Sequence, residues 1–135
     1  MPDNVMRTRR LKNPGRFAAD ADALAMQWTS VTPAINLAIH FGAARVVLLG
    51  VDGNFAADGR RHCHDDRYPW PYVPGCFDRH AEEFRRIAPS ARDMDVEIVN
   101  ANPDSRIDAW PRMPIGTIPA SSTCSSRSTF PIAAR

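Results

Sequence analysis

The densest group of chemically capable side chains is the run His62-Cys63-His64-Asp65-Asp66. The imidazoles of His62 and His64 titrate near neutral pH, so either ring can act as a general base. A carboxylate from Asp65 or Asp66 can hold such a ring in one orientation. We therefore take His62 and His64 as the candidate catalytic residues, with a solvated polar loop as the alternative interpretation.

The same run nearly matches the HxHxDH motif of metallo-β-lactamase-like hydrolases, in which neutral imidazoles and a carboxylate hold two metal ions. Arg67 occupies the position of the last histidine, and its positive charge repels a second metal. The other histidines, His40 and His80, fall on segments expected to be helical. We therefore predict no metal site and no resident cofactor.

Polar residues also follow two apolar segments, 45–50 and 95–100. Asp52 can accept hydrogen bonds from ribose hydroxyls, or it can form an Asp-Gly turn. After the second segment, amide and hydroxyl side chains can read a base or ribose, or form an Asx turn before a proline. The candidate nucleotide-binding residues in these two places are Gly50, Asp52, Asn54, Asn102 and Ser105.

Ser30 is a further candidate because it precedes a segment with helical periodicity. Thr32 can serve as the N-cap, Pro33 suits the first helical position, and Gly42 is the expected left-handed stop. Helix N-termini favour anions, so the Ser30 hydroxyl can face a phosphate, with plain helix capping as the alternative. The run Arg45–Gly50 that follows is apolar beyond its first residue, which is typical of a strand covered on both faces.

Later segments complete a helix–strand–helix–strand order. Residues 53–76 are rich in proline and glycine and predict a long loop of the kind that forms functional lids. Helical spacing returns at Phe77–Ala88 and is expected to stop at Pro89, before a second strand at Asp95–Asn100. Strands joined by a helical crossover run parallel. The polar residues that follow the two strands are therefore expected at one sheet edge, facing the lid histidines.

The predicted fold class is α/β: a partial Rossmann-like open parallel sheet with flanking helices and disordered termini. Residues 1–16 are basic and polar, so we expect little order there, and 17–28 predict a short helix or an irregular lead-in. The Rossmann-like domain is expected to span 17–118. Residues 119–135 are rich in serine and threonine and predict a disordered tail.

Composition limits the classes of protein to consider. The chain has 135 residues, 44% of them hydrophobic and 24% charged, which is ordinary for one soluble globular domain. A net charge of +2 gives no argument for a nucleic-acid partner. Three cysteines without CxxC spacing favour a reducing cytoplasm over a disulfide framework. No apolar run approaches the roughly 18–20 residues of a membrane span.

The order and spacing of several blocks resemble the carboxyl-terminal half of bacterial sialyltransferases of the Campylobacter lipooligosaccharide type. Phage and prophage proteins of unassigned activity share this resemblance, and Maf proteins and archaeal-type hydroxymethylpterin diphosphokinases are more distantly similar. The matching blocks span about Thr29 to Ser105: Thr29-Ser30, the helix Ala34–Gly42, VVLLGVD ending at Asp52, a lid histidine, a helix near Phe77–Ile87, and VEIVNANPDS ending at Ser105.

The resemblance implies a role for each matching residue. Ser30 corresponds to a serine beside the nucleotide phosphate, and Gly50 and Asp52 to the cytidine and ribose side of the site. His62 or His64 corresponds to the base that deprotonates the acceptor hydroxyl, and Asn102–Ser105 to a loop near the nucleotide. Such enzymes transfer sialic acid from CMP-sialic acid by direct displacement and need no metal.

The chain departs from this family in three places, which leave several functions open. Val31 and Asn54 replace a glycine and a tyrosine of the family, and the first strand with its glycine-rich turn is absent. The first interpretation is a sialyltransferase-like domain of prophage origin, either active or an inactive fragment, to which a second copy could supply the missing half. The alternatives are a magnesium-dependent pyrophosphokinase-like domain using Asp65 and Asp66, and a non-enzymatic truncated phage protein.

Overall fold

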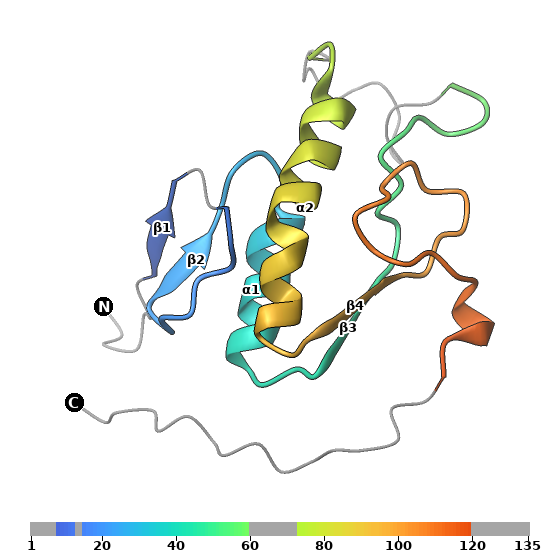
Figure 1. Cartoon of the computed structure of the whole chain (residues 1–135). Coiled ribbons are helices and arrows are strands. Elements are labelled where there is room, and N and C mark those ends of the chain that lie inside the picture. The colour runs from blue at the N-terminus through green and yellow to red at the C-terminus, as the bar shows by residue number, and fades with distance from the viewer. Residues whose placement is uncertain (1–7, 13–14, 60–72, 120–135) are drawn as a thin grey trace, which may run out of the picture.

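The computed structural model describes residues 8–12, 15–59 and 73–119, and Figure 1 shows how their elements are arranged. This part of the chain is mixed α/β with two helices and two short parallel sheets. In chain order its elements are β1 (Arg9–Leu11), β2 (Ala23–Ala25), α1 (Val31–His40), β3 (Arg45–Leu48), α2 (Cys76–Asp93), β4 (Glu97–Asn100) and a 3-10 turn, Ile115–Thr117.

The predicted strand–helix–strand unit is present, because β3 and β4 pair in parallel on either side of α2 in the sequence. Their register pairs Arg45 with Glu97 and Leu48 with Asn100. Both strands therefore deliver their carboxyl ends to the same edge of the sheet. The other two strands, β1 and β2, form a separate parallel pair, so the described residues contain two sheets where one open sheet was expected.

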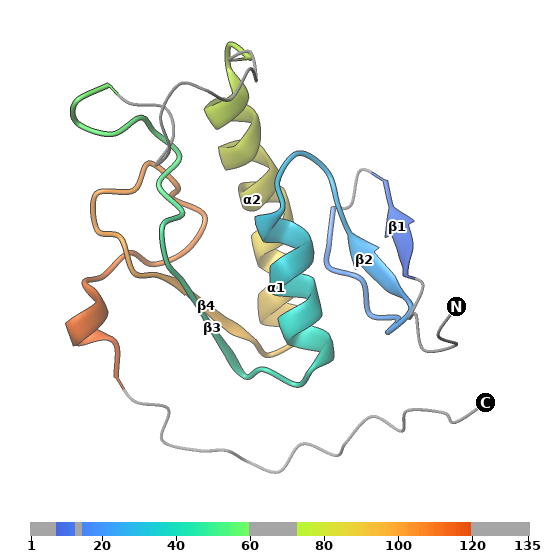
Figure 2. The same ribbon diagram turned by 180° about the vertical axis from the view of Figure 1, so that it is seen from behind.

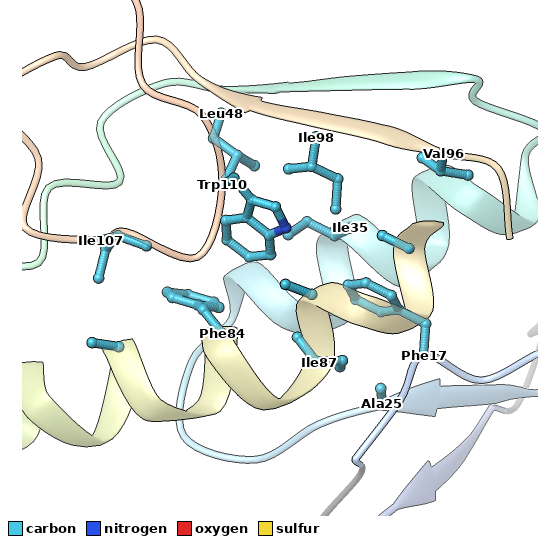
Figure 3. Close-up of a cluster of buried hydrophobic side chains, with 13 residues drawn as sticks. Phe17, Ala25, Ile35, Leu48, Phe84, Ile87, Val96, Ile98, Ile107 and Trp110 are labelled. Atoms are coloured by element: carbon cyan, nitrogen blue, oxygen red, sulfur yellow. The ribbon is translucent and has the colours of Figure 1, made fainter. Parts of the chain in front are cut away.

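The two helices lie between the two sheets, as both views show (Figures 1 and 2). One hydrophobic core joins the helices, β2, β3, β4 and the segment after β4. In it the Phe84 and Trp110 rings pack with centroids 5.0 Å apart, beside Ile35, Leu48 and Ile98 (Figure 3). Side chains of α2 therefore hold the segment that follows β4 against the carboxyl end of the sheet.

Helix α1 begins two residues earlier than capping chemistry predicts. Ser30 occupies the N-cap position without a side-chain hydrogen bond, and the Thr32 N–H instead donates to Thr29 Oγ1 at 3.2 Å. The prediction of Thr32 as N-cap is wrong because Thr32 is fully buried and its hydroxyl donates to the carboxylate of Glu83 on α2. The predicted left-handed stop at Gly42 is confirmed, with φ of +83°.

Strand β3 is not covered on both faces, contrary to the prediction. Leu48 is buried on the helix side, whereas Val47 and Leu49 on the other face are 39% and 65% exposed. The strand also ends at Leu48, two residues before the end of the apolar run. The reason is that β3 has one strand neighbour among the described residues and one layer of helices over it.

Helix α2 continues through Pro89, where the sequence predicts a stop. A proline inside a helix removes one backbone hydrogen bond and costs roughly 3 kcal/mol. Pro89 lies on the exposed side, while Ile87, Ala88 and Ala91 on the opposite side are buried in the core. Burial of these side chains keeps the last turn helical and outweighs the loss.

The N-terminal region is more ordered than predicted. Strand β1 lies within the stretch 1–16, for which little order was expected, and β2 lies within 17–28, expected to be a helix or irregular. The Arg9 guanidinium donates to both carboxylate oxygens of Asp22, at 3.0 and 3.1 Å. Asn36 of α1 accepts the N–H groups of Ala18 and Ala25 at 2.9 and 2.8 Å. These contacts, made by residues distant in the sequence, order the segment.

Candidate functional site

The loops that follow β3 and β4 lie side by side beyond the strand ends, in green and orange in Figure 1. The Ala101 N–H donates to Leu48 O at 2.9 Å, and the Arg106 N–H donates to Asp52 O at 2.8 Å. The expectation that Asp52 and Asn102 reach one rim is therefore confirmed. We call the segments 50–54 and 100–106 together the rim.

Two buried polar side chains tie the rim together. Asn100 Nδ2 donates to Val51 O at 2.9 Å and to Ser105 Oγ at 3.0 Å, and Asn100 Oδ1 accepts the Asn102 N–H at 3.1 Å. Ser105 Oγ in turn donates to Val51 O at 2.7 Å and accepts the Ile107 N–H at 3.0 Å. Because both side chains are buried and fully paired, Ser105 holds the loops in place and its hydroxyl faces away from solvent.

Asp52 and Asn102 form a partly exposed pair on the rim. Asn102 Nδ2 donates to Asp52 Oδ1 at 2.5 Å, and both side chains are half-buried. Asn102 Oδ1 also accepts the Asp104 N–H at 2.9 Å, so the Asx turn that was the alternative interpretation of this residue is present. Asn102 therefore fixes the orientation of the Asp52 carboxylate, whose second oxygen makes no hydrogen bond with a described residue.

A small pocket opens where the rim meets α2. Its volume is about 110 Å³, and its lining residues are Gly53, Phe77, Asp78, Ala81, Arg85 and Arg106. Gly53 has φ of +66°, and a Cβ there would lie 2.5 Å from the Ile107 Cδ1 atom. Only glycine fits this position without displacing the rim. We call this hollow the rim pocket.

The charges around the rim pocket differ in how they are paired. The Arg85 guanidinium donates to both oxygens of Asp108, at 2.9 and 3.0 Å, and this hydrogen bond holds the pKa of Asp108 below its usual value. Asp78 is exposed on the first turn of α2. The Arg106 side chain is exposed and forms no ion pair or hydrogen bond with any described residue. Arg106 is therefore the cation available to a ligand here.

The candidate catalytic histidines, His62 and His64, lie outside the described residues, as do Asp65 and Asp66. The segments on either side of them do reach the rim pocket. Phe55 packs edge-on against Phe77, with ring centroids 5.0 Å apart, and Phe77 lines the pocket.

Ser30 and Gly50 lie at a second hollow, on the other side of the 50–54 turn. This groove has a volume of about 310 Å³ and runs between α1 and β3, with Ser30, Val31, Ala34, Ile35, Val46, Val47, Leu48, Leu49 and Val51 as its lining. Ser30 is exposed, and Gly50, with φ of +66°, connects two of the lining residues. Apart from Ser30, the residues that line the groove are apolar, and Arg45 lies nearby. The rim pocket differs because charged residues form part of its lining.

Glu83 of α2 contacts the N-terminal end of α1. Its Oε1 atom accepts the Thr32 hydroxyl, and Oε2 accepts the Trp28 N–H at 2.8 Å. The carboxylate is buried, so its negative charge already sits beside the positive end of the helix dipole. An anion at Ser30 would therefore meet a helix end whose field is partly cancelled.

Sequence patterns did not indicate Arg106, Phe77 or Arg85 as members of a site. A lone arginine after Ser105 has no motif to identify it, and Phe77 and Arg85 belong to an ordinary amphipathic helix. Their shared feature is proximity to Gly53, which depends on the loop geometry. Asn54, a predicted member, is half-buried and its side chain bonds no described residue.

Residues 8–12, 15–59 and 73–119 contain no group of three or more metal-ligating side chains. None of the helices in that part of the chain is long and apolar enough to cross a membrane.

Comparison with protein-family models, with curated proteins and with solved structures returned no match.

Proposed function

We propose that this chain is a nucleotide-binding domain of the sialyltransferase-like type, with the nucleotide lying along the rim of a Rossmann-like half sheet and its phosphate at the rim pocket. The observation that carries this proposal is that two side chains lie near the joint carboxyl ends of two parallel strands: the Arg106 guanidinium, unpaired among the described residues, and the Asp52 carboxylate, oriented by Asn102. In open α/β sheets ligands bind outside the carboxyl ends of the strands.

The phosphate group is assigned to Arg106. A guanidinium binds phosphate through charge-assisted and often bidentate hydrogen bonds, and Arg106 lines a pocket of about 110 Å³. The alternative position beside Ser30 is a helix N-terminus whose groove has no charged residue among its described lining, and Glu83 lies close to it. The prediction that Ser30 contacts the phosphate therefore competes with Arg106, and one pair of variants separates them.

The ribose is assigned to Asp52. Asn102 holds one carboxylate oxygen at 2.5 Å, and the other, which bonds none of the described residues, would accept a sugar hydroxyl. The alternation of acid and base along the rim, with Asp78 on the opposite wall, suits a ligand that carries both hydroxyl groups and an anion. Asn54 and Asn102 then border the ligand, Gly50 lies on the groove side of the turn, and Ser105 acts through the backbone that it holds.

The transfer chemistry rests on the resemblance and on the two lid histidines. His62 or His64 takes the proton of the acceptor hydroxyl, whose oxygen forms the new bond to the anomeric carbon of sialic acid. The bond from that carbon to the phosphate oxygen breaks, and CMP leaves with the electron pair. Arg106 would stabilise the charge that develops on the leaving phosphate.

Calorimetric titration with CMP, CTP and cytidine, each with and without magnesium, tests the assignment. CMP is expected to bind without magnesium and more tightly than cytidine, because cytidine lacks the phosphate. Arg106→Ala is expected to weaken CMP about tenfold and cytidine hardly at all, the loss of one charge-assisted contact. Arg86→Ala is the matched control, since Arg86 is exposed on α2 away from the pocket.

The remaining outcomes distinguish the other functions. A loss of CMP affinity in Ser30→Ala but not in Arg106→Ala would move the phosphate to the α1 terminus. Binding of CTP that requires magnesium would favour a pyrophosphokinase-like domain. No heat with any of the ligands would contradict the proposal and leave the non-enzymatic phage protein.

A further inference from the structure

The rim pocket has room for one small group of a ligand. Its volume is about 110 Å³, whereas sites that enclose a whole small molecule have roughly 300–1,000 Å³. One group of the ligand therefore enters the pocket, and the rest lies along the rim. The group assigned to the pocket above is the phosphate, beside Arg106.

The positive charge that the pocket offers is smaller than its lining suggests. The lining contains two arginines, Arg85 on α2 and Arg106 on the rim. The Arg85 guanidinium already donates to both carboxylate oxygens of Asp108, at 2.9 and 3.0 Å, and Glu82 approaches it at 3.8 Å. A ligand therefore meets one guanidinium, that of Arg106, without a carboxylate partner among the described residues.

Asp78 adds a carboxylate to the same lining, from the exposed side of the first turn of α2. Its charge reaches Arg85. The hydrogen bond to Asp108, and then the charges of Asp108, Glu82 and Asp78, raise the pKa of Arg85 above its ordinary value. A second negative charge on a ligand group would be attracted by Arg106 but repelled by Asp78 and Glu82. Such a group therefore gains little from its extra charge.

We propose that Asp78 limits the charge of the group that the rim pocket accepts, so that a phosphate ester with one negative charge is favoured over phosphates with two or more. A phosphate that joins two groups carries one charge, whereas a terminal phosphate carries close to two above its second pKa of about 6. The site would therefore hold an esterified nucleotide and release the free nucleotide more readily. The inference rests on the proposed nucleotide site and adds the residue that sets its charge preference.

Calorimetric titration with three cytidine ligands at pH 8, without magnesium, tests the proposal. Cytidine 5′-methyl phosphate carries one negative charge, CMP close to two and CTP about four. The wild-type chain is expected to bind the methyl ester at least as tightly as CMP, and to bind CTP most weakly. The series changes the charge of the ligand while the base and the ribose stay the same.

Asp78→Asn removes the carboxylate and keeps the size of the side chain. The affinity is expected to rise about twofold for the methyl ester and about fourfold for CMP, since a factor of about two for each ligand charge is typical of exposed charge pairs. CTP should gain at least as much as CMP. These gains should shrink in 0.5 M NaCl, because salt screens exposed charges. A purely structural effect of Asp78 would follow neither the ligand charge nor the salt.

Asp93→Asn is the matched control because it removes the same charge from the other end of α2. Asp93 is exposed and does not line the pocket. At a rise of 1.5 Å per residue it lies roughly 22 Å from Asp78 along the helix. That distance exceeds the Debye length of about 10 Å at 0.1 M salt, so the affinities for all three ligands should stay unchanged.

Two results would overturn the role of Asp78 and leave the nucleotide site standing. The first is an equal change of affinity for all three ligands in Asp78→Asn. The second is tighter binding of CTP than of the methyl ester by the wild-type chain. In both cases CMP still binds and still depends on Arg106. A wild-type chain that binds neither CMP nor the methyl ester would overturn the nucleotide site and, with it, the role of Asp78.

Discussion

The rim and the β3 edge lie next to each other, yet they use their residues in opposite ways. At the rim, Asn100 and Ser105 are buried and every polar atom of their side chains has a partner. At the β3 edge, Val47 and Leu49 are exposed and their backbone groups have no partner among the described residues. The buried polar side chains of the rim thus hold the loops in place. The unpaired backbone groups of the β3 edge, in contrast, lie beside exposed apolar side chains.

This comparison changes how the candidate site is interpreted. Of the rim residues, one carboxylate oxygen of Asp52 and the guanidinium of Arg106 have no partner in the part of the chain that the structure describes, so these two are the candidates to contact a ligand. Gly53 and Asn102 set the conformation of the loops that carry Asp52 and Arg106. Substitutions at the rim should therefore separate into those that cost stability and those that cost binding.

The largest effect is expected for Asn100→Ala. The substitution leaves Val51 O and the buried Ser105 hydroxyl with one donor fewer and the half-buried Asn102 N–H without an acceptor, and should lower the free energy of unfolding by about 3 kcal/mol. Val47→Ala, at the half-exposed edge, should cost less than about 1 kcal/mol. Urea denaturation measures both. Equal losses would mean that the rim network is no more important than the edge.

The next largest effect concerns the contact that holds α1 over the groove. Glu83 accepts two hydrogen bonds, from the Thr32 hydroxyl and the Trp28 N–H, and Gln offers one acceptor oxygen in place of two. Glu83→Gln should lower the free energy of unfolding by about 2 kcal/mol.

Glu82→Gln is the matched control for Glu83→Gln. Glu82 is exposed on the same helix and approaches Arg85 only at 3.8 Å, so its loss should change stability by less than about 0.5 kcal/mol. A similar cost for both variants would show that Glu83 contributes nothing specific to the position of α1.

A smaller effect is expected from pH. Burial lowers the pKa of His80 below its ordinary value of 6.5, against an opposing effect of Glu83 and with a small addition from Arg79. The unfolded chain then binds a proton more readily than the folded one, so stability is complete above pH 6.5 and falls as the pH drops toward the pKa of the folded state.

Urea midpoints at pH 7.5 and pH 5.5 measure this dependence on His80. His80→Gln should reduce the fall between the two values. The carboxylates held by arginines, Asp22 and Asp108, have pKa values below their usual one of 3.8 and lose their contribution only at lower pH. An unchanged fall in His80→Gln would assign the pH dependence to other groups.

Local patterns predicted the central unit of the fold well. Periodicity and the Gly42 stop indicate α1, the apolar run indicates β3, and the crossover rule predicts that β3 and β4 are parallel. A common rim for Asp52 and Asn102 follows from that direction alone. These features depend on residues close in the sequence or on general rules of chain connection.

The remaining features depend on contacts between distant residues. Thr32 is buried rather than capping because Glu83 lies 51 positions away in the sequence and beside it in space. Strands β1 and β2 have three residues each and owe their order to Asn36 and to the Arg9–Asp22 pair. The same limit applies to Arg106, which joins the site through the conformation of the Gly53 turn.

The position of the nucleotide is the most direct test of the contrast between rim and edge. Backbone chemical-shift changes on titration of CMP into the isotope-labelled chain would map it. The account predicts shifts at Gly53, Asp78 and Arg106, with Ser30, Val47 and Leu49 unchanged. Shifts confined to Ser30 and the groove, or no shifts at either place, would contradict it.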